Sequence, residues 1–225
     1  MKKVAIIVAG GSGKRMNSTL PKQFMLLKNK PILMYSIERF YQYDPLIEIR
    51  VILAPSEFIT WEKLCEKYHF KIKHTLFEGG EHRFDSVKNG LKDLLNPALV
   101  AIHDGVRPLV SLKTIANCFD LAEKNGVAIP VLELKESIRR LTVDSSECEE
   151  RQFFRTVQTP QVFYSEIILK AYEASYKDSF TDDASVVENY GQKIFLTNGN
   201  EENIKITTHV DLLIAHILID NLYDI

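Results

Sequence analysis

Residues 3–16 read KVAIIVAGGSGKRM, an apolar run that leads directly into a glycine-rich turn. The run Lys3–Val8 is β-branched and apolar on both faces, which is typical of a central strand in a parallel sheet. Glycines after such a strand let the backbone approach an anion and point successive N–H groups at it. The stretch therefore predicts an α/β protein with an anion-binding loop after its first strand; the alternative is a simple tight turn.

The LPKQ segment a few residues later makes the anion-binding interpretation more specific. Pro21 stiffens the backbone beside Lys22, so that the ammonium can be presented to the same anion, and Arg15 adds a planar guanidinium. Two such cations suit a triphosphate that loses pyrophosphate, although Lys22 taken singly is equally well explained as a solvated lysine. Two commoner motifs do not fit, because a dinucleotide fingerprint needs glycine at Met16 and a P-loop needs glycine at Val8.

Length and composition describe an ordinary globular protein. The 225 residues carry 28 Lys and Arg against 30 Asp and Glu, a net charge of -2, so we expect no surface for nucleic acid. A length about 1.5 times that of a usual domain predicts one large domain, residues 1–225. Three widely separated cysteines indicate neither a disulfide framework nor a zinc site, and they favour the reducing cytoplasm: Cys65, Cys118 and Cys148.

The N-terminus resembles a signal peptide only superficially. Met1–Lys3 is basic and residues 4–9 are apolar, but this run is shorter than a secretory core and charged residues follow it without a small-residue cleavage site. No other stretch approaches the roughly 18 apolar residues that a membrane span needs. We therefore expect a cytoplasmic protein with no membrane partner.

Strand-like runs alternate with segments of helical period along most of the chain, which predicts βαβ units and a mainly parallel sheet. The further expected strands are Ile49–Leu53, Ile72–Phe77, Leu99–His103 and Val127–Val131. Five helices are expected. The first follows Pro31 and has Ile32, Tyr35, Ile37 and Phe40 on one side; the second is capped by Ser56 and carries Trp61, Leu64 and Tyr68; the third has Phe84, Val87, Leu91 and Leu94 on one face. The last two are Leu112–Asn125, closed by Gly126, and Val210–Leu222, capped by Thr208 with Asp211.

Residues 133–157 interrupt this alternation. They lack a helical period and contain a turn signal at Asp144–Ser146, with alternating side chains on both sides of it: Ile138, Leu141 and Val143 before, Phe153 and Thr156 after. The pattern predicts a protruding β-hairpin, and an arm with little core beneath it is often stabilised by a second subunit. The alternative is a mobile surface loop. Phe153 and Phe154 are expected to be buried at a subunit interface rather than stacked on a base.

Further motifs follow in a fixed order: GGEHRFDSV from Gly79, HDGVRP from His103, QTPQ from Gln158, TDDAS from Thr181 and NIKIT from Asn203. Together with AGGSGKRM and LPKQF they span nearly the whole chain and resemble the motifs of the sugar-phosphate cytidylyltransferases. This resemblance implies a Rossmann-like nucleotidyltransferase fold, class α/β, with a mainly parallel, mixed central sheet. It also implies a homodimer in which the arm at 133–157 joins the subunits.

The resemblance further implies a role for each matching residue. CTP would be bound by Ala9, Gly10, Gly11, Ser12, Gly13, Arg15, Lys22, Gly80, Glu81, Ser86, Gly105 and Lys205. The sugar phosphate would be bound by Asp104, Arg107, Arg151, Thr159, Thr181 and Lys205, with Arg151 reaching across from the neighbouring subunit. The catalytic groups would be Arg15, Lys22, Arg151 and Lys205, the first two as stabilisers of the transition state.

The expected reaction is transfer of the cytidylyl group of CTP to a small polyol phosphate. Relatives that use 2-C-methyl-D-erythritol 4-phosphate often carry a stretch similar to Ser137–Arg140, so this acceptor is expected. It is an intermediate of non-mevalonate isoprenoid biosynthesis. The alternative acceptor is ribitol 5-phosphate. Many relatives have two alanines at Gly105–Val106, and the bulkier valine should change the pocket wall near Arg107.

In-line attack on the α-phosphorus needs positioning and positive charge more than a general base. Mg²⁺ is expected mainly on the CTP phosphates, because no compact carboxylate cluster marks a protein-built metal site.

Several other residues could serve chemistry but are better explained structurally. His103 could act as a base, yet a hydrogen-bonded structural histidine is the better interpretation. Asp182 and Asp183 could form an acid–base pair, but carboxylates in this position more often cap a helix. We also interpret three side chains as structural: Trp61, His209 and His216. A non-catalytic nucleotide-binding module remains the alternative from another class, and Met16 argues against an NAD-dependent dehydrogenase.

Overall fold

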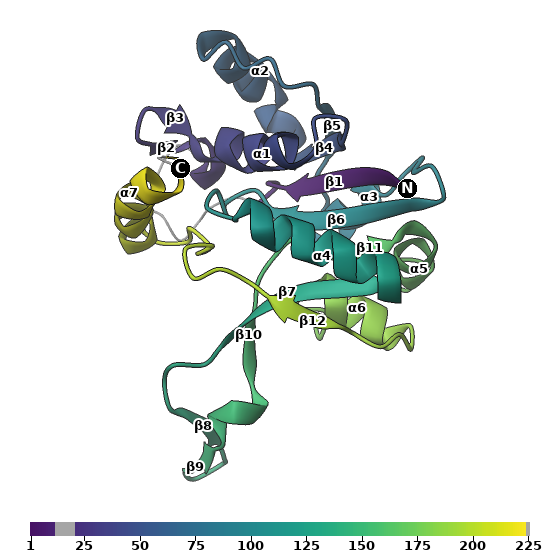
Figure 1. Cartoon of the computed structure of the whole chain (residues 1–225), viewed down its shortest axis with the longest axis vertical. Coiled ribbons are helices and arrows are strands. Elements are labelled where there is room, and N and C mark those ends of the chain that lie inside the picture. The colour runs from purple at the N-terminus through teal and green to yellow at the C-terminus, as the bar shows by residue number, and fades with distance from the viewer. Residues whose placement is uncertain (12–20, 224–225) are drawn as a thin grey trace.

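A computed structural model describes residues 1–11 and 21–223 of the chain. Within these residues the main sheet has the strand order β10-β7-β11-β6-β1-β4-β5, with β12 paired to the far side of β7. Its strands are β1 (Lys2–Val8), β4 (Glu48–Leu53), β5 (Thr75–Glu78), β6 (Ala98–Asp104), β7 (Val127–Glu133), β10 (Arg155–Val157), β11 (Gln161–Tyr164) and β12 (Leu196–Asn198). The pairs formed by β1, β4, β5 and β6 are parallel, whereas β11 runs antiparallel to both β6 and β7. The predicted mixed, mainly parallel α/β sheet is therefore confirmed (Figure 1).

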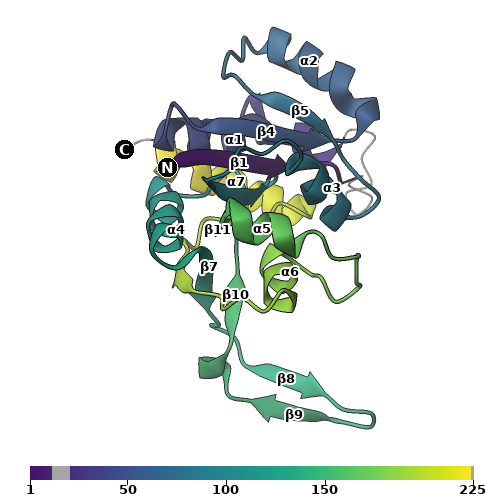
Figure 2. The same ribbon diagram turned by 90° about the vertical axis from the view of Figure 1, so that its right-hand side faces the viewer.

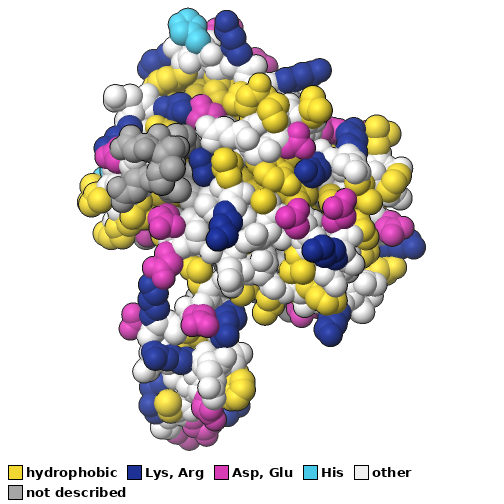
Figure 3. All heavy atoms as spheres, in the orientation of Figure 1, with side chains coloured by type: hydrophobic (Ala, Val, Ile, Leu, Met, Phe, Trp, Pro, Cys, Tyr) yellow, Lys and Arg dark blue, Asp and Glu magenta, His cyan; other side chains and the backbone are white. Residues whose placement is uncertain are grey.

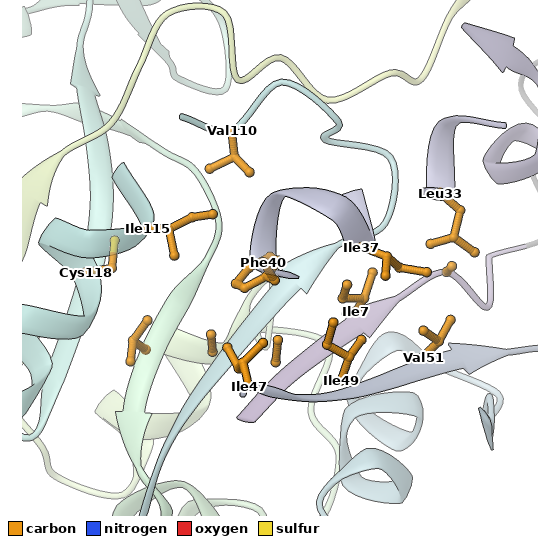
Figure 4. Close-up of a cluster of buried hydrophobic side chains, with 14 of the residues drawn as sticks. Ile7, Leu33, Ile37, Phe40, Ile47, Ile49, Val51, Val110, Ile115 and Cys118 are labelled. Atoms are coloured by element: carbon orange, nitrogen blue, oxygen red, sulfur yellow. The ribbon is translucent and has the colours of Figure 1, made fainter. Parts of the chain in front are cut away.

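Helices cover both faces of this sheet. They are α1 (Ile32–Tyr43), α2 (Phe58–Lys67), α3 (Arg83–Gly90), α4 (Leu112–Asn125), α5 (Ser165–Ala171), α6 (Asp183–Asn189) and α7 (His209–Tyr223). Alternate residues of β1 enter different cores: Ala5 and Ile7 pack with α1, α2 and α4, whereas Val4 and Ile6 pack with α3, α5 and α6. Figure 4 shows Ile7 of the first core beside Ile37 of α1. All four of these β1 side chains are completely buried, which explains why this strand is apolar on both faces.

Three predicted boundaries are wrong. Ser56 does not cap a helix, because Pro55 starts a short 3-10 turn, η3 (Pro55–Glu57), and α2 begins only at Phe58. The strand expected from Ile72 begins at Thr75, since the residues before it pack around Trp61, whose indole N–H donates to His74 Nε2 at 2.9 Å. The packing interpretation of Trp61, which is fully buried, is thereby confirmed.

The helix predicted around Phe84 also ends early. Its last helical residue is Gly90 rather than a residue near Leu94, although Leu91 is still buried just beyond the end. Other ends agree with their predictions. Helix α4 ends at Asn125, and Gly126 adopts the left-handed conformation with φ 84° that favours glycine at this position.

The C-terminal helix α7 has the predicted N-terminal cap. The Asp211 backbone N–H donates to the Thr208 hydroxyl at 3.2 Å, and the Thr208 N–H donates to the Asp211 carboxylate at 2.7 Å. Its His216 accepts a hydrogen bond from the Lys28 backbone at 3.2 Å, which confirms its structural interpretation. This helix lies against β2 (Leu26–Leu27), which pairs with β3 (Lys30–Pro31), and its buried residues pack on Val106 and Ile206.

The predicted hairpin arm projects from the body (Figure 2). Its strands are β8 (Ile138–Leu141) and β9 (Ser146–Glu149), which pair antiparallel. The expected return strand around Phe153 is wrong: η4 (Arg151–Phe153) follows β9, and β10 pairs with β7 at the base of the arm. The Thr142 N–H donates to the Ser145 carbonyl at 3.0 Å, so a tight turn sets the register of β8 and β9 before the chain reaches Phe153.

Basic, acidic and hydrophobic side chains are interspersed on the surface of the arm (Figure 3). Phe153 is 75% exposed and Phe154 41% exposed in the single chain, so their burial at a subunit interface stays a prediction. Among residues 1–11 and 21–223, every helix is too short or too polar to span a bilayer.

Candidate active site

Two adjoining cavities lie where β1 and β6 end, at the carboxyl edge of the parallel strands where α/β sheets commonly bind ligands. The first, of about 300 Å³, is lined by Val8, Ala9, Gly10, Gly11, Lys22, Gln23, Gly80, Glu81, His82, Arg83, Ser86, Asp104, Val106 and Lys205. The second, of about 280 Å³, is lined by Arg83, Asp104, Arg107, Val157, Gln158, Thr159, Gln161, Thr181, Asp182 and Lys205. Arg83, Asp104 and Lys205 belong to both cavities, and we call these three residues the shared wall.

The first cavity is formed by the turn after β1 and the loop before α3. Gly80 is required there, because a Cβ on it would lie 2.3 Å from the Asp85 Cβ. Its N–H donates to the Ser86 hydroxyl at 3.0 Å, and that hydroxyl donates to the His82 carbonyl at 3.1 Å. Gly10 approaches the same loop closely, since its Cβ position is 3.5 Å from the Gly79 Cα. Backbone therefore forms much of this cavity wall.

Most residues expected to bind CTP lie around this first cavity. Those on its wall are Ala9, Gly10, Gly11, Lys22, Gly80, Glu81, Ser86 and Lys205. Lys22 and Lys205, from distant parts of the sequence, thus both line this cavity. Three expected residues, Ser12, Gly13 and Arg15, lie outside the described part of the chain.

Gly105 does not line either cavity. It is buried behind the wall, where its N–H donates to the Val8 carbonyl at 2.8 Å and its carbonyl accepts from the Ser36 hydroxyl at 3.0 Å. A Cβ on it would lie 3.0 Å from side-chain carbons of Ala9 and Leu33, so close packing explains the glycine. Val106 was expected to alter the wall near Arg107, but the structure places it on the first cavity instead.

The shared wall is centred on Asp104, the last residue of β6. Its Oδ2 lies 3.1 Å from Lys205 Nζ and 3.2 Å from Arg107 Nε, and its Oδ1 lies 3.6 Å from Arg83 Nε. Burial alone would raise the pKa of Asp104, but these three cations hold the pKa of its carboxyl well below the usual range. Asp104 is therefore an anion that fixes the cations around it.

The second cavity contains most residues expected to bind the sugar phosphate: Asp104, Arg107, Thr159, Thr181 and Lys205. The Arg107 guanidinium also donates to the Asn203 carbonyl at 2.7 Å, which orients it. Thr181 is exposed at the rim. Most described residues of the two expected substrate sets thus line one or both of two cavities that meet at the shared wall.

His103 lies behind the second cavity and is completely buried. Its Nε2 faces the Arg107 carbonyl at 3.0 Å, which can only accept, so Nε2 carries the proton. Its Nδ1 then accepts from the Thr159 hydroxyl at 3.0 Å, and that oxygen accepts from the Asp104 N–H at 3.1 Å. Burial lowers the pKa of His103 to about 4. The structural interpretation is confirmed, because both ring nitrogens are hydrogen-bonded to buried groups of the chain.

Asp182 and Asp183 have separate structural roles. The Asp182 carboxylate caps α6 by accepting from the Ser185 N–H at 2.9 Å, as predicted for this pair. Asp183 is fully buried and binds Arg83 through both oxygens, at 2.9 and 2.7 Å. Sequence reasoning assigned Arg83 no role, although it stands inside the GGEHRFDSV motif, and it also missed Gln23 and Gln158 on the cavity walls.

Arg151 is a second expected site residue, besides Gly105, that lines neither cavity in the single chain. It lines a separate cavity of about 1040 Å³ at the base of the arm, together with Lys135, Arg155 and Glu201. Its guanidinium donates to the Lys135 carbonyl. Its expected contact with the sugar phosphate bound by a neighbouring subunit stays a prediction.

Carboxylates at the two cavities do not form a metal site. No group of three or more His, Cys, Asp or Glu side chains that could hold a metal ion occurs within residues 1–11 and 21–223. On the cavity walls, Asp104 is bound by cations, and Asp182 caps a helix and accepts from Gln161 at 2.8 Å. Asp104 and Asp182 are therefore already bound by partners within the chain.

Known proteins resemble this chain over nearly its full length. A curated 2-C-methyl-D-erythritol 4-phosphate cytidylyltransferase of Phocaeicola vulgatus is 48% identical over 219 residues, covering 97% of this chain and 100% of that protein. One of Azobacteroides pseudotrichonymphae is 50% identical over 222 residues, covering 97% and 99%.

Solved structures agree with these sequence relatives. The 4-diphosphocytidyl-2C-methyl-D-erythritol synthase of Anaerococcus prevotii superposes with a TM-score of 0.83 at 25% identity and covers 97% of this chain and 98% of that one. The 2-C-methyl-D-erythritol 4-phosphate cytidylyltransferase of Thermus thermophilus superposes with a TM-score of 0.79 at 26% identity, covering 98% and 100%. The IspD family model, described as 2-C-methyl-D-erythritol 4-phosphate cytidylyltransferase, matches residues 3–221. The chain, with its two cavities and their motifs, therefore belongs to the 2-C-methyl-D-erythritol 4-phosphate cytidylyltransferase family.

Proposed function

We propose that this chain transfers the cytidylyl group of CTP to 2-C-methyl-D-erythritol 4-phosphate, as a step of non-mevalonate isoprenoid biosynthesis. The observation that carries the proposal is the pair of adjoining cavities with a wall of Arg83, Asp104 and Lys205 in common. CTP would occupy the first cavity and the acceptor the second. The acceptor phosphate and the α-phosphate of CTP would then meet at the shared wall.

The reaction forms one bond and breaks one. An oxygen of the acceptor phosphate attacks the α-phosphorus, the bond from that phosphorus to the bridging oxygen of the β-phosphate breaks, and pyrophosphate leaves with the electron pair. The product is 4-diphosphocytidyl-2-C-methyl-D-erythritol. A phosphate monoester is already mostly ionised near neutral pH, so no side chain has to remove a proton. The chain's contribution is to hold two anions in line and to stabilise the charge of the transition state.

Two lysines would supply much of that stabilisation. Lys22 and Lys205 line the same cavity, and Arg15 of the glycine-rich turn would join them on the phosphates. Lys205 also belongs to the second cavity, so that its ammonium would contact the attacking phosphate as well as CTP. Asp104 limits where this ammonium can lie, because the two form an ion pair at 3.1 Å.

The remaining groups would orient the substrates. Backbone N–H groups of the turn after β1 would bind the CTP phosphates, and Gly80, Glu81 and Ser86 would contact cytosine and ribose. Thr159 already donates its hydroxyl proton to His103, so toward the acceptor it can only accept a hydrogen bond. Mg²⁺ would enter bound to the CTP phosphates and neutralise part of their charge.

A second subunit is part of the proposal. The arm would join two copies of this single-domain protein in the cytoplasm, covering Phe153 and Phe154 and bringing Arg151 of each arm to the acceptor site of its partner. The exposed apolar side chains of the arm support this arrangement, since such side chains are rarely left together on a monomer surface.

The direct test is release of pyrophosphate from CTP and Mg²⁺ with each of two acceptors. We expect rapid release with 2-C-methyl-D-erythritol 4-phosphate and at least a hundredfold lower kcat/KM with ribitol 5-phosphate. Equal or faster turnover of ribitol 5-phosphate would reject the proposed acceptor. Binding of CTP without turnover of either acceptor would reject the transferase assignment.

A further inference from the structure

Arg83 is the member of the shared wall to which the proposed reaction assigns no contact. It is the first residue of α3, and it lines both cavities. Its side chain is only 29% exposed. An arginine at the junction of two anion-binding cavities can either touch a substrate or hold other groups in place, and its hydrogen bonds decide between these roles.

One edge of the Arg83 guanidinium is fully occupied by Asp183. The two terminal nitrogens donate to the two carboxylate oxygens at 2.9 and 2.7 Å, the two-point geometry that restricts both side chains. Asp183 is completely buried at the start of α6, where it also accepts from the Tyr172 hydroxyl at 2.6 Å. Arg83 is therefore held to α6, at the acceptor side of the shared wall.

The other edge of Arg83 faces Asp104. Its Nε lies 3.6 Å from Asp104 Oδ1, while Asp104 Oδ2 is bound by Lys205 and Arg107. Cations on both oxygens restrict the rotation of this carboxylate, and its rotation decides where the Lys205 ammonium lies. A continuous series of contacts thus joins Tyr172, Asp183, Arg83, Asp104 and Lys205.

We propose that Arg83 is a positioning residue: bound to Asp183, it sets the orientation of Asp104 and thereby the place of the Lys205 ammonium between the two cavities. The proposal rests on the proposed function, because it concerns the efficiency of that transfer. Arg83 acts through Asp104 and Lys205, and it is not a catalytic residue in this sense.

The competing explanation is that Arg83 only balances the buried charge of Asp183. Removing one partner of a buried ion pair leaves the other charge uncompensated and destabilises the protein, whereas removing both charges avoids this. A double variant, R83Q/D183N, therefore separates the two explanations. If Arg83 is merely structural, the double variant regains both stability and activity; if Arg83 positions Asp104, it regains stability alone.

The experiment compares the wild-type protein with R83Q, D183N and R83Q/D183N. For each, thermal unfolding, the dissociation constant for CTP, and kcat and KM for the acceptor are measured. We expect both single variants to unfold at a lower temperature and the double variant to recover most of that loss. Its kcat should remain at least tenfold below wild type, while its dissociation constant for CTP changes less than threefold. Wild-type kcat in the double variant would overturn the proposal.

A conservative variant covers the case in which R83Q/D183N does not fold. Arg83→Lys keeps a positive charge for Asp183, but one ammonium cannot bind both oxygens of Asp183 and also reach Asp104. Its kcat should fall at least tenfold while it stays folded, and unchanged kcat would contradict the proposal.

The matched control is Glu48→Gln. Glu48 pairs with the buried Arg50 at 2.6 Å, outside both cavities, and Arg50 keeps its hydrogen bonds to the carbonyls of Gly90 and Lys92. This variant should keep wild-type kcat, and a loss equal to that of R83Q/D183N would overturn the proposal. Wild-type protein that turns over neither acceptor would instead reject the proposed function, so the two failures are distinguishable.

Discussion

The shared wall and the arm use charged side chains in opposite ways. Asp104 of the wall is 9% exposed, and Asp183, which binds Arg83 of the wall, is fully buried. Each carboxylate is paired with positive charge from another part of the same chain. On the arm, Arg140 pairs with Glu147 while both are more than half exposed, and the neighbouring Leu141 and Val143 are 84% and 99% exposed.

This contrast distinguishes charges that are fully paired within one chain from side chains that one chain leaves exposed. Buried ion pairs hold groups at defined distances, since an unpaired charge there would be costly. Exposed pairs contribute little, and exposed apolar side chains gain from being covered. The wall is thus preorganised within a single chain, whereas the arm keeps apolar side chains exposed that the proposed second subunit would cover.

Removing a cation from the first cavity is expected to have the largest effect. Lys22→Ala should lower kcat by 10²–10³-fold, about 2.7–4 kcal/mol, as loss of a charge contact in the transition state does. Steady-state pyrophosphate release measures this. Lys113→Ala removes an exposed lysine of α4 that lines neither cavity, and it should leave kcat unchanged. A comparable rate for both variants would contradict the role of Lys22.

Lowering the pH should reduce the free energy of unfolding through His103, which lies behind the second cavity. The folded protein lowers the pKa of His103 to about 4 from its ordinary 6.5, so the unfolded chain takes up a proton first as the pH falls. Because of this group, the free energy of unfolding should fall by about 2 kcal/mol from pH 7 to pH 5. Urea unfolding at the two pH values should show a smaller pH dependence in His103→Asn. An identical pH dependence in both proteins would contradict the neutral imidazole.

The arm should affect only one substrate. Arg151→Ala should raise the acceptor KM on the order of tenfold and leave the dissociation constant for CTP unchanged, because one lost charge-assisted hydrogen bond is worth about 1.5 kcal/mol or more. Mixing this variant with a Lys205→Ala variant tests where Arg151 acts. Mixed dimers should regain activity, since one of their two sites has both wild-type residues. Absence of rescue after demonstrated subunit exchange would indicate action within one chain.

The exposed ion pairs of the arm should matter least. Arg140→Gln removes contacts to Glu147 at 2.7 Å and Glu149 at 2.9 Å. The free energy of unfolding should change by less than about 1 kcal/mol, because solvent and salt screen such pairs. Chemical denaturation at low and high salt measures the change. A loss above 2 kcal/mol would show that the arm, like the wall, depends on its charges.

Local sequence patterns were sufficient for much of the fold. The apolar period of Lys3–Val8, the helix closed by Gly126 and the Thr208 cap depend on contacts within a few residues, and all three are present. The errors at Ser56 and Ile72 arose where contacts distant in sequence, around Trp61, or a proline turn replaced the local preference.

The motifs also indicated which residues belong to a site, because the glycine-rich turn and the lysine after Pro21 occur together, although each alone has a simpler explanation. They could not indicate how charges pair across the fold. Arg83 and Asp183 are 100 residues apart, and only the packing of α3 against α6 brings them together and makes their burial possible. The same holds for Asp104 and Lys205, whose ion pair exists because the end of β6 and the segment before α7 meet at one cavity.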